Sequence, residues 1–473
     1  MRTFRWLVMT GLFMAVVGGP GELLAAELQS PSESKKDFQG MSVPKTLEER
    51  LEELEQKMRN ADHLRELDQQ GEAQRAKEAP VVGADQNGFF LRSADRAFAL
   101  RFKGYAQVQG RFFFGNTAQS NATDSFEVRR FRPILEGTLY RYIKFQLMPD
   151  FGQGRVRLYT GTIGFDYWTT LRFQAGKFKA PVGLERLQSA SDTVFIERGL
   201  PTNLVPNRDI GVQLYGDLFD NRLAYQVGVF NGVRDNTSSS GGTNVDFDSN
   251  NDKDYMVRLF AQPFRATDVE WLQGLKAGVS GTWGRDNFAP SNFRIPASGN
   301  DGITFFRYLG GVRVSGDRYR LTPQAYYAWG PLGVLGEYVW NIQDLRTSGG
   351  DKRQLTNRAW QVAMSYVLTG ENASFTGVKP WRPFNPAQGA WGAVELAVRY
   401  QELLVDREAF PLLADPAVSA RKARAWTVGI NWHLAHRIKV MVNFEHGIFD
   451  GGAPNNKNFE QENSLFTRLQ VAW

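Results

Sequence analysis

The chain contains no cysteine and, beyond its first residues, no long run of apolar side chains. The absence of cysteine is compatible with an oxidising compartment such as the periplasm. Mean hydropathy is −0.38, and no later stretch approaches the ~20 apolar residues that a transmembrane helix needs. A helical membrane protein is therefore excluded. A soluble exported protein and an outer-membrane barrel both remain, because a barrel alternates apolar with polar residues.

Catalytic motifs are also missing from the sequence. The four histidines are His63, His433, His436 and His446. There is no serine nucleophile elbow, no helical pair of metal-binding histidines and no glycine-rich phosphate loop. We therefore expect neither an enzyme nor a cofactor or bound metal; an outer-membrane hydrolase, which would depend on His446, is the alternative. The net charge of +6 is too small to predict nucleic-acid binding.

The first residues have the layout of a secretory signal peptide. Arg2 and Arg5 precede an apolar run at 6–17, and small residues follow around Ala25 and Ala26. We expect cleavage near Ala26, which makes residues 1–26 the signal peptide. A membrane-anchoring helix is the alternative, but the apolar run is shorter than the ~20 residues of a membrane span.

Residues 27–88 are expected to form a periplasmic linker and coiled-coil segment. Serine, lysine and proline dominate the first part, and "TLEERLEELEQKMRNADHLREL" follows. Arg65 and Asp68 end its apolar seam after about two heptads, so the helix alone would be marginal in water. An oligomeric barrel would hold such helices together; a solvated helix without a partner is the alternative. The seam comprises Leu47, Leu51, Leu54, Met58 and Ala61.

A period of two dominates residues 89–473. In "FALRFKGYAQVQGRFF", every second residue from Phe98 to Phe112 is apolar or small, and the intervening residues are polar. This stretch exceeds the usual 5–6 residues of a soluble strand but suits the ~9–11 of a tilted transmembrane strand. The pattern predicts strands at 98–112, 127–139, 143–150, 155–165, 170–178, 209–219, 222–231, 254–264, 274–284, 318–329, 333–342, 357–368, 391–401, 422–434, 437–447 and 462–473.

Most connections between these strands alternate between short and long, as in outer-membrane barrels with short periplasmic turns and long external loops. An even number of strands returns the chain to the periplasmic side. We therefore expect an all-β fold, a 16-stranded antiparallel transmembrane β-barrel in the bacterial outer membrane, with the N-terminal segment in the periplasm. Two segments strain this scheme: "ITFFRYLGGVRV", which we place in an external loop, and "TGENASFTGVKPWRPFNPAQGA", which is long for a periplasmic turn.

The polar face of each strand should line a water-filled lumen, because Arg or Lys facing lipid costs up to ~2–4 kcal/mol. Fixed cations in a pore concentrate anions, and the arginine fork suits oxyanions. Arg129 would face outward in strict alternation unless a bulge turns it. Acidic groups such as Glu136, Glu185 or Asp209 would balance the cations in a general, non-selective porin, which is the alternative. The expected inward cations are Arg101, Lys103, Arg111, Arg130, Arg132, Lys144 and Arg172.

The segment from Lys179 to Asp209 carries too many apolar residues for a solvated loop. Folded into the barrel, it would bury them against the wall and form a constriction, with Arg186 and Ser189 facing the channel. The alternative is an external loop packed on its neighbours. The last residues, "LFTRLQVAW", end in an aromatic side chain in lipid-facing register, which resembles the signal that barrel-assembly machinery recognises.

Several stretches resemble the phosphate-selective porin O and P family: "FEVRRFRPILEGTLY", "QAGKFKAPVGLERLQSASDTVFIERG", "DIGVQLYGDL", "YQVGVFNG", "YVLTGE" and "GAVELAVRYQEL". The resemblance implies a homotrimeric channel in outer-membrane lipid for passive diffusion of small anions, phosphate or other oxyanions. It also implies that Arg129 and Arg130 belong to the anion-binding eyelet, and that Arg186 and Ser189 match a binding lysine and serine. A second binding lysine falls near Ser191 or Asp192 here, which weakens the case for phosphate. A structural or tethering barrel is a further alternative.

Overall fold

The computed structural model describes residues 46–115, 122–238, 246, 248, 250–296 and 302–473. The chain divides into two units, Met1–Ala73 and Gln74–Trp473. The expected signal peptide and the linker up to residue 45 lie outside the described residues. Helix α1 (Leu47–Glu78) begins with a capping box, in which Thr46 and Glu49 each accept a hydrogen bond from the other's backbone amide. Its leucine seam is exposed. No helix among the described residues is long and apolar enough to cross a membrane.

A short hairpin precedes the barrel, where the sequence predicted only a lead-in to the first strand. The helix continues to Glu78, and strands β1 (Val81–Asp85) and β2 (Gly88–Arg92) follow. Strand β2 pairs with the first residues of β3, Phe89 lying opposite Phe102. The segment was missed because its strands have five residues each, too few for a period to stand out.

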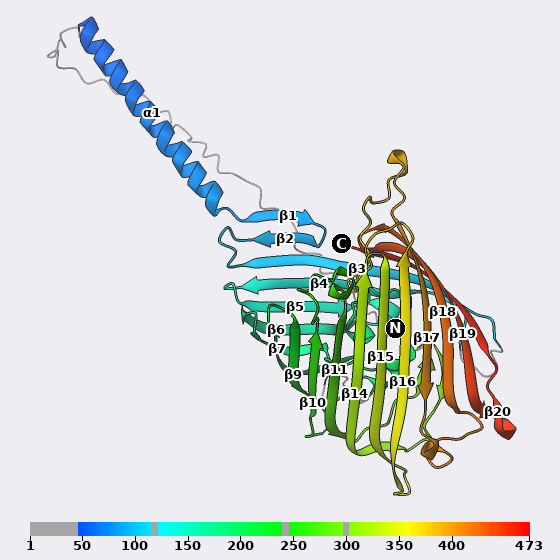
Figure 1. The fold of residues 1–473 in the computed structure, drawn as a ribbon. Helices are drawn as coiled ribbons and strands as arrows, with labels where there is room; N and C mark the ends of the chain where they lie inside the picture. Colours follow the sequence, from blue (N-terminus) through cyan, green and yellow to red (C-terminus); the bar gives the residue numbers. More distant parts are fainter. Residues whose placement is uncertain (1–45, 116–121, 239–245, 247, 249, 297–301) are drawn as a thin grey trace, which may run out of the picture. The chain divides into compact units, whose positions relative to one another are not determined.

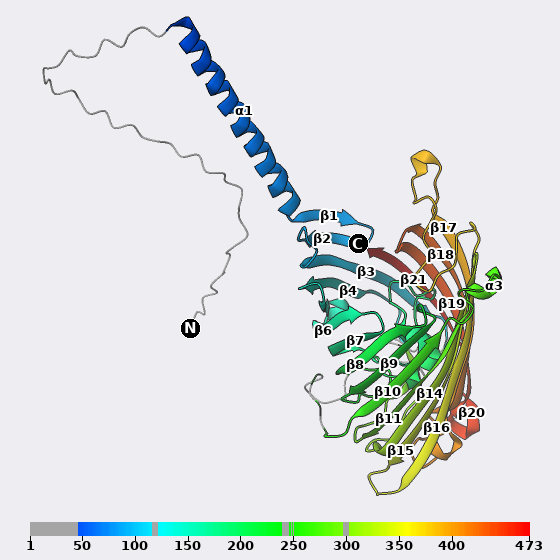
Figure 2. The ribbon, with the colours of Figure 1, turned by 60° about the vertical axis from the view of Figure 1, so that its left-hand side comes forward.

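Sixteen strands form the barrel, as predicted. Each pairs antiparallel with the next along the chain, and β21 pairs with β3, which closes the sheet (Figures 1 and 2). Every predicted strand is present, with ends that differ by a few residues. The strands are β3 (Ala99–Phe113), β4 (Ser125–Leu139), β5 (Ile143–Asp150), β6 (Arg157–Trp168), β7 (Leu171–Lys179), β8 (Arg208–Leu218), β9 (Leu223–Phe230), β10 (Asp254–Ala261), β11 (Lys276–Asp286), β14 (Arg313–Trp329), β15 (Leu332–Arg346), β16 (Lys352–Val367), β17 (Ala393–Leu404), β18 (Ala420–Ala435), β19 (Ile438–Ala453) and β21 (Glu462–Ala472).

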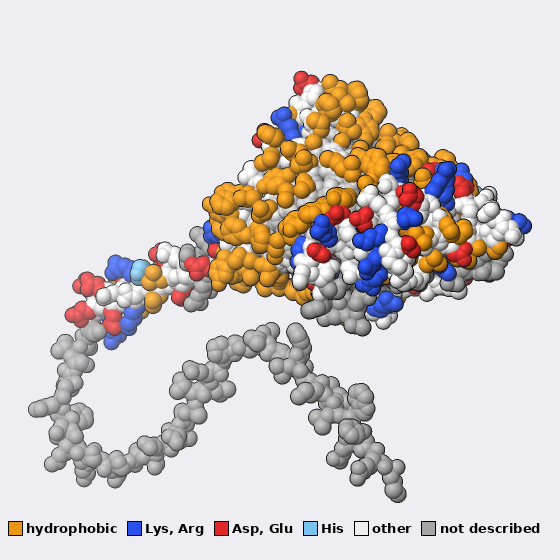
Figure 3. All heavy atoms as spheres, turned by 90° about the horizontal axis from the view of Figure 1, so that it is seen from below, with side chains coloured by type: hydrophobic (Ala, Val, Ile, Leu, Met, Phe, Trp, Pro, Cys, Tyr) orange, Lys and Arg blue, Asp and Glu red, His pale blue; other side chains and the backbone are white. Residues whose placement is uncertain are grey.

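Alternate residues of the barrel strands meet opposite environments, as the period of two predicts. On β3, Val108 is 45% exposed, whereas its neighbours Gln107 and Gln109 are buried inside. Figure 3 shows hydrophobic side chains covering a broad area of the outer surface. The sheet therefore presents an apolar surface outward, as a lipid bilayer requires, and on strands such as β3 it presents polar side chains inward.

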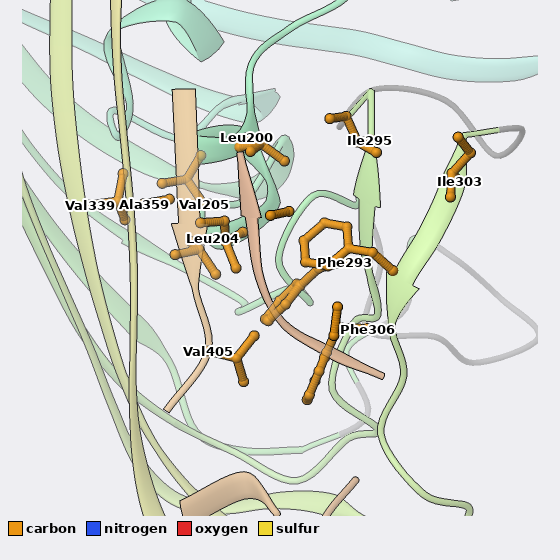
Figure 4. Packing of buried hydrophobic residues seen from close by; sticks show 14 of the residues in the cluster. Leu200, Leu204, Val205, Phe293, Ile295, Ile303, Phe306, Val339, Ala359 and Val405 are labelled. Carbon is orange, nitrogen blue, oxygen red and sulfur yellow. The ribbon is translucent and has the colours of Figure 1, made fainter. Parts of the chain in front are cut away.

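Part of the lumen is filled by loops. Strands β12 (Phe293–Ile295) and β13 (Ile303–Phe306) form a separate two-stranded sheet in the external connection between β11 and β14, where the sequence analysis placed "ITFFRYLGGVRV". Its last two residues instead begin β14. In Figure 4 this small sheet packs against η2 (Leu200–Leu204) and the inner wall of the barrel. The cluster leaves the side of the lumen beside β3–β8 for the channel described below.

Shorter elements complete the chain. The helices α2 (Leu184–Leu187), α3 (Glu270–Gln273), η1 (Gly152–Gly154), η3 (Pro386–Gln388), η4 (Arg407–Ala409) and η5 (Pro454–Asn456) lie in connections, and β20 (Lys457–Asn458) pairs with the end of β19.

Candidate functional site

A β-bulge on β4 brings two adjacent arginines to the same face of the sheet. Gln107 of β3 lies opposite Arg130, and Val108 lies opposite Val128, so Arg129 is the extra residue. A bulge reverses the alternation beyond it, and Arg129 and Arg130 are both buried inside the barrel. Strict alternation would have placed Arg129 in lipid. The bulge that the sequence analysis left open is present, and it turns the guanidinium inward.

The connection from β7 to β8, residues 180–207, lies inside the barrel rather than on its outer end. Its backbone is tied to the opposite wall: the Ile196 amide donates to Asn443 Oδ1 at 2.6 Å, and the Leu200 amide donates to Gln401 Oε1 at 2.7 Å. Val182, Leu200 and Leu204 are fully buried. This inner loop narrows the lumen and places charged side chains across from β4.

Glu197 of the inner loop is the anionic centre of the constriction. Its Oε1 accepts from Arg129 Nε at 3.0 Å and from an Arg468 guanidinium nitrogen at 3.2 Å, and its Oε2 lies 4.0 Å from Arg130 Nη2. Burial alone would raise the pKa of Glu197, but the surrounding arginines outweigh it and hold the pKa well below its usual range. The carboxylate is therefore ionised.

A second cluster of cations surrounds Tyr159 of β6. The guanidinium carbons of Arg132 and Arg208 each lie 3.6 Å from the centre of the Tyr159 ring, one on each face because two guanidiniums do not fit on the same face. Arg132 also donates to the Tyr105 hydroxyl at 2.7 Å and to Asp150 Oδ2 at 2.8 Å. These contacts hold both guanidiniums rigidly in the channel wall.

Two cavities meet at this cluster. One has a volume of about 750 Å³ and extends to the external loops. The other measures about 360 Å³ and reaches the β1–β2 turn and the C-terminus. Both are lined by Arg132, Tyr159, Arg198 and Asn207, which therefore mark the narrow passage between them.

The lining of both cavities is strongly cationic. The external cavity has ten Lys or Arg side chains and one carboxylate, Asp235, among its described lining residues. The periplasmic cavity has six cationic residues and no Asp or Glu among the described residues that line it. The cations are Arg129, Arg130, Arg132, Arg155, Arg157, Lys177, Arg186, Arg198, Arg234 and Arg294 in the first, and Lys103, Arg132, Lys179, Arg198, Arg208 and Arg437 in the second.

The structure brings about half of the predicted site residues to these cavities. Arg129, Arg130, Arg132 and Arg186 line the external one, and Lys103 and Ser189 line the periplasmic one. Arg186 donates to Thr202 O at 2.8 Å and to Asn236 Oδ1 at 2.6 Å, and burial among other arginines lowers its pKa to about 9. The Ser189 hydroxyl lies 2.9 Å from that of Ser191.

The other four predicted residues lie elsewhere. Arg111 is buried in the lumen, 3.6 Å from Glu127. Arg101 pairs with Asp85 of β1 at 2.6 Å. Lys144 donates to Thr138, and Arg172 pairs with Asp217, both close to the periplasmic turns.

Five residues of this site were not predicted from the sequence: Tyr159, Glu197, Arg198, Arg208 and Arg468. Arg208 and Arg468 lie on inward-facing positions of their strands, so the period of two could have identified them. Glu197 and Arg198 lie in the inner loop, where no period reveals direction. Of the acidic residues expected to balance the pore, Glu136 pairs with Lys103 at 2.7 Å and Glu185 with Arg399 at 3.3 Å. Asp209 Oδ2 accepts a hydrogen bond from the Gly232 amide at 2.9 Å. None of the three lines either cavity.

Comparison with known proteins agrees with this architecture. Residues 102–473 match the family model described as phosphate-selective porin O and P. Porin O of Pseudomonas aeruginosa is 24% identical over 437 residues, which cover 84% of this chain and 93% of that protein. The outer-membrane channel DcaP of Acinetobacter baumannii shares the fold, with a TM-score of 0.52 at 10% identity over 83% of this chain and 99% of that one. OmpT of Vibrio cholerae gives a TM-score of 0.48 at 13% identity, covering 80% of this chain and 100% of its own.

The family match spans most of the chain, and the solved fold is that of an outer-membrane channel. The chain is therefore a bacterial outer-membrane porin, not an enzyme, and it belongs to the phosphate-selective porin O and P family.

Proposed function

We propose that the barrel is a channel for passive diffusion of small anions, with a preference for anions over cations. The observation that carries this proposal is the charge of the two cavities, whose described lining has one carboxylate in total. The acidic groups that neutralise individual arginines, such as Glu197 and Asp150, do not line either cavity. Mobile anions would therefore be concentrated and cations repelled along the whole path. A non-selective pore would need carboxylates facing the same water.

Phosphate or a similar oxyanion is the substrate class that the narrow passage suits best. The Arg132 and Arg208 guanidiniums flank Tyr159, and Arg198 joins Arg132 at the junction of the cavities. Planar guanidiniums bind tetrahedral oxyanions through paired hydrogen bonds. The family's description points the same way. The second binding lysine that the family resemblance implies is replaced here by Ser191 or Asp192. This replacement argues against a site that is highly specific for phosphate.

The reversal potential in a salt gradient across a planar bilayer tests the proposal. The wild-type potential should have the sign of anion preference, and Arg198→Gln should reduce it. Arg198 is the suitable target because it lines both cavities and donates hydrogen bonds to the carbonyl oxygens of Glu185 and Gln188. Added phosphate should also reduce the chloride current of the wild type more than that of the variant.

The matched control is Arg172→Gln, which removes a cation near a periplasmic turn that lines neither cavity. Its reversal potential should equal that of the wild type. Equal effects of the two substitutions, or cation preference in the wild type, would contradict the proposal.

We further propose that the porin assembles as a homotrimer and that α1 forms a short periplasmic coiled coil, with residues 1–26 removed as a signal peptide. Residues 89–473 would then be the outer-membrane domain, in which the closed sheet begins at β3. The exposed heptad leucines of α1, including Leu51 and Leu54, support the coiled coil, because leucines at this spacing gain most by packing against copies of themselves.

A further inference from the structure

One periplasmic connection has a size that the channel does not require. Residues 368–392 join β16 to β17, whereas five of the other periplasmic connections have two to four residues, at 140–142, 169–170, 219–222, 330–331 and 436–437. We call residues 368–392 the β16–β17 tongue. In Figures 1 and 2 it projects beyond the ends of β16 and β17. It lines neither cavity.

Large aromatic side chains of the tongue face outward. Trp381 is 70% exposed, Trp391 62% and Phe384 36%. A single exposed apolar side chain is ordinary, but three aromatic rings within eleven residues make a patch, and such patches mark interaction sites. Tryptophan in particular is enriched at membrane–water interfaces, where its ring is half in an apolar environment and its N–H in a polar one.

This aromatic patch is joined to the lipid-facing surface of the barrel. The Phe384 ring lies edge-on to Trp432 of β18 at 5.4 Å and to Trp391 at 5.7 Å. Trp432 Nε1 donates to Trp391 O at 2.7 Å. Trp432 shares the outward face of β18 with Val428 and Ile430 and lies near the periplasmic end of the strand. The patch therefore continues the inner aromatic girdle of the barrel.

The charge of the tongue is one-sided. Residues 372–394 contain Lys379 and Arg382 and no Asp or Glu. The carboxylate within the tongue, Glu371, is buried and accepts hydrogen bonds from Thr369 and the Trp381 amide. Cations beside an aromatic girdle attract anionic headgroups.

We propose that the β16–β17 tongue binds anionic phospholipids of the periplasmic leaflet. Trp381, Phe384 and Trp391 lie at the boundary between headgroups and acyl chains, and Lys379 and Arg382 contact the phosphates. A cell-wall glycan or a protein would also cover exposed aromatic rings. Neither explains why the rings are continuous with Trp432, which faces lipid.

The absence of cysteine from the chain allows a direct test in intact porin. Pro383→Cys, between Trp381 and Phe384, carries a bimane label in vesicles of phosphatidylethanolamine and phosphatidylglycerol. We expect quenching by lipids with a nitroxide on the headgroup and protection from aqueous iodide. A label at Val428→Cys, on the lipid face of β18, gives the behaviour of a side chain in lipid. A label at Ser348→Cys, in an exposed external loop, gives the behaviour of a side chain in water. If the Pro383→Cys label behaves like the Ser348→Cys label, the tongue lies in water and the proposal is wrong.

A second set of variants separates lipid binding from simple proximity to the bilayer. Adding Trp381→Ala and Trp391→Ala to Pro383→Cys should lower headgroup quenching to the Ser348→Cys level. The matched control is Trp271→Ala, which removes a comparably exposed tryptophan from the connection between β10 and β11 and should change nothing. Lys379→Gln with Arg382→Gln should lower quenching when phosphatidylglycerol is present, and not in phosphatidylcholine alone.

Channel conductance reports folding in every variant and should stay at the wild-type value. Quenching that survives loss of both tryptophans, or that ignores headgroup charge, would overturn the assignment.

Discussion

Three guanidiniums of the constriction, those of Arg129, Arg130 and Arg468, converge on the carboxylate of Glu197. Each arginine is buried, and a buried charge without a partner costs several kcal/mol. One carboxylate shared by three cations reduces that cost while leaving an excess of positive charge. Glu197 therefore stabilises the folded constriction and lowers its net positive charge.

Replacing this carboxylate by a neutral isostere should increase anion preference. Glu197→Gln keeps an oxygen that accepts from the arginines but removes one negative charge, so the reversal potential should move further in the anion direction. Protonation of Glu197 would act in the same sense. Because its pKa is held well below the usual range, the wild type should show the same reversal potential at pH 7 and pH 5. A rise in anion preference at pH 5 that is absent from Glu197→Gln would show that Glu197 titrates in this range.

Glu136→Gln is the control for this substitution. Glu136 pairs with Lys103 at 2.7 Å, and both side chains are partly exposed, so loss of its charge should be screened by solvent. If Glu136→Gln shifts the reversal potential as far as Glu197→Gln does, the contacts of Glu197 with the three arginines have no special effect on ion preference.

At the level of elements, the strands could be predicted because the side chains on one face of each strand contact lipid and those on the other face point into the barrel. That constraint imposes a period of two along every strand, and it also identified Arg130 and Arg132 as inward. The β12–β13 sheet and the β1–β2 hairpin were not predicted, because neither spans the membrane. The inner loop has no period either, so Glu197 and Arg198 could not be placed from sequence.

The bulge on β4 gives a prediction that depends on register alone. Deletion of Arg129 leaves Arg130 opposite Gln107 and Val128 opposite Val108, so every other side chain keeps its face. Deletion of Val128 instead moves Arg129 into the lipid-facing position opposite Val108. Arginine on that face costs up to ~2–4 kcal/mol, so the Val128 deletion should unfold at a much lower urea concentration than the Arg129 deletion. Tryptophan fluorescence of the porin in vesicles measures the unfolding. Equal stability of the two deletions would mean that the extra residue is not Arg129.

For the whole molecule, the inner face of the barrel is divided between an apolar and a cationic part. The β12–β13 sheet and η2 fill the lumen beside β15–β19, where Val339, Ala359 and Leu403 are fully buried. The channel lies against β3–β8, whose residues line the two cavities. A sixteen-stranded barrel encloses more space than a single file of ions needs, and the apolar filling reduces it to a path lined by fixed charge.

The division of the chain into two units allows each unit to be tested separately. Residues 74–473 contain both cavities and the closed sheet, so deletion of residues 27–78 from the exported chain should leave single-channel conductance unchanged. If α1 forms a coiled coil, the same deletion should lower the temperature at which the oligomer dissociates on a detergent gel. Leu51→Ser with Leu54→Ser should lower it too, whereas Glu52→Ser with Glu55→Ser, on the flank of the seam, should not. If the leucine substitutions do not change the dissociation temperature, α1 is a solvated helix and the proposed coiled coil is wrong. If the wild type migrates as a monomer on the gel, the proposed trimer is wrong.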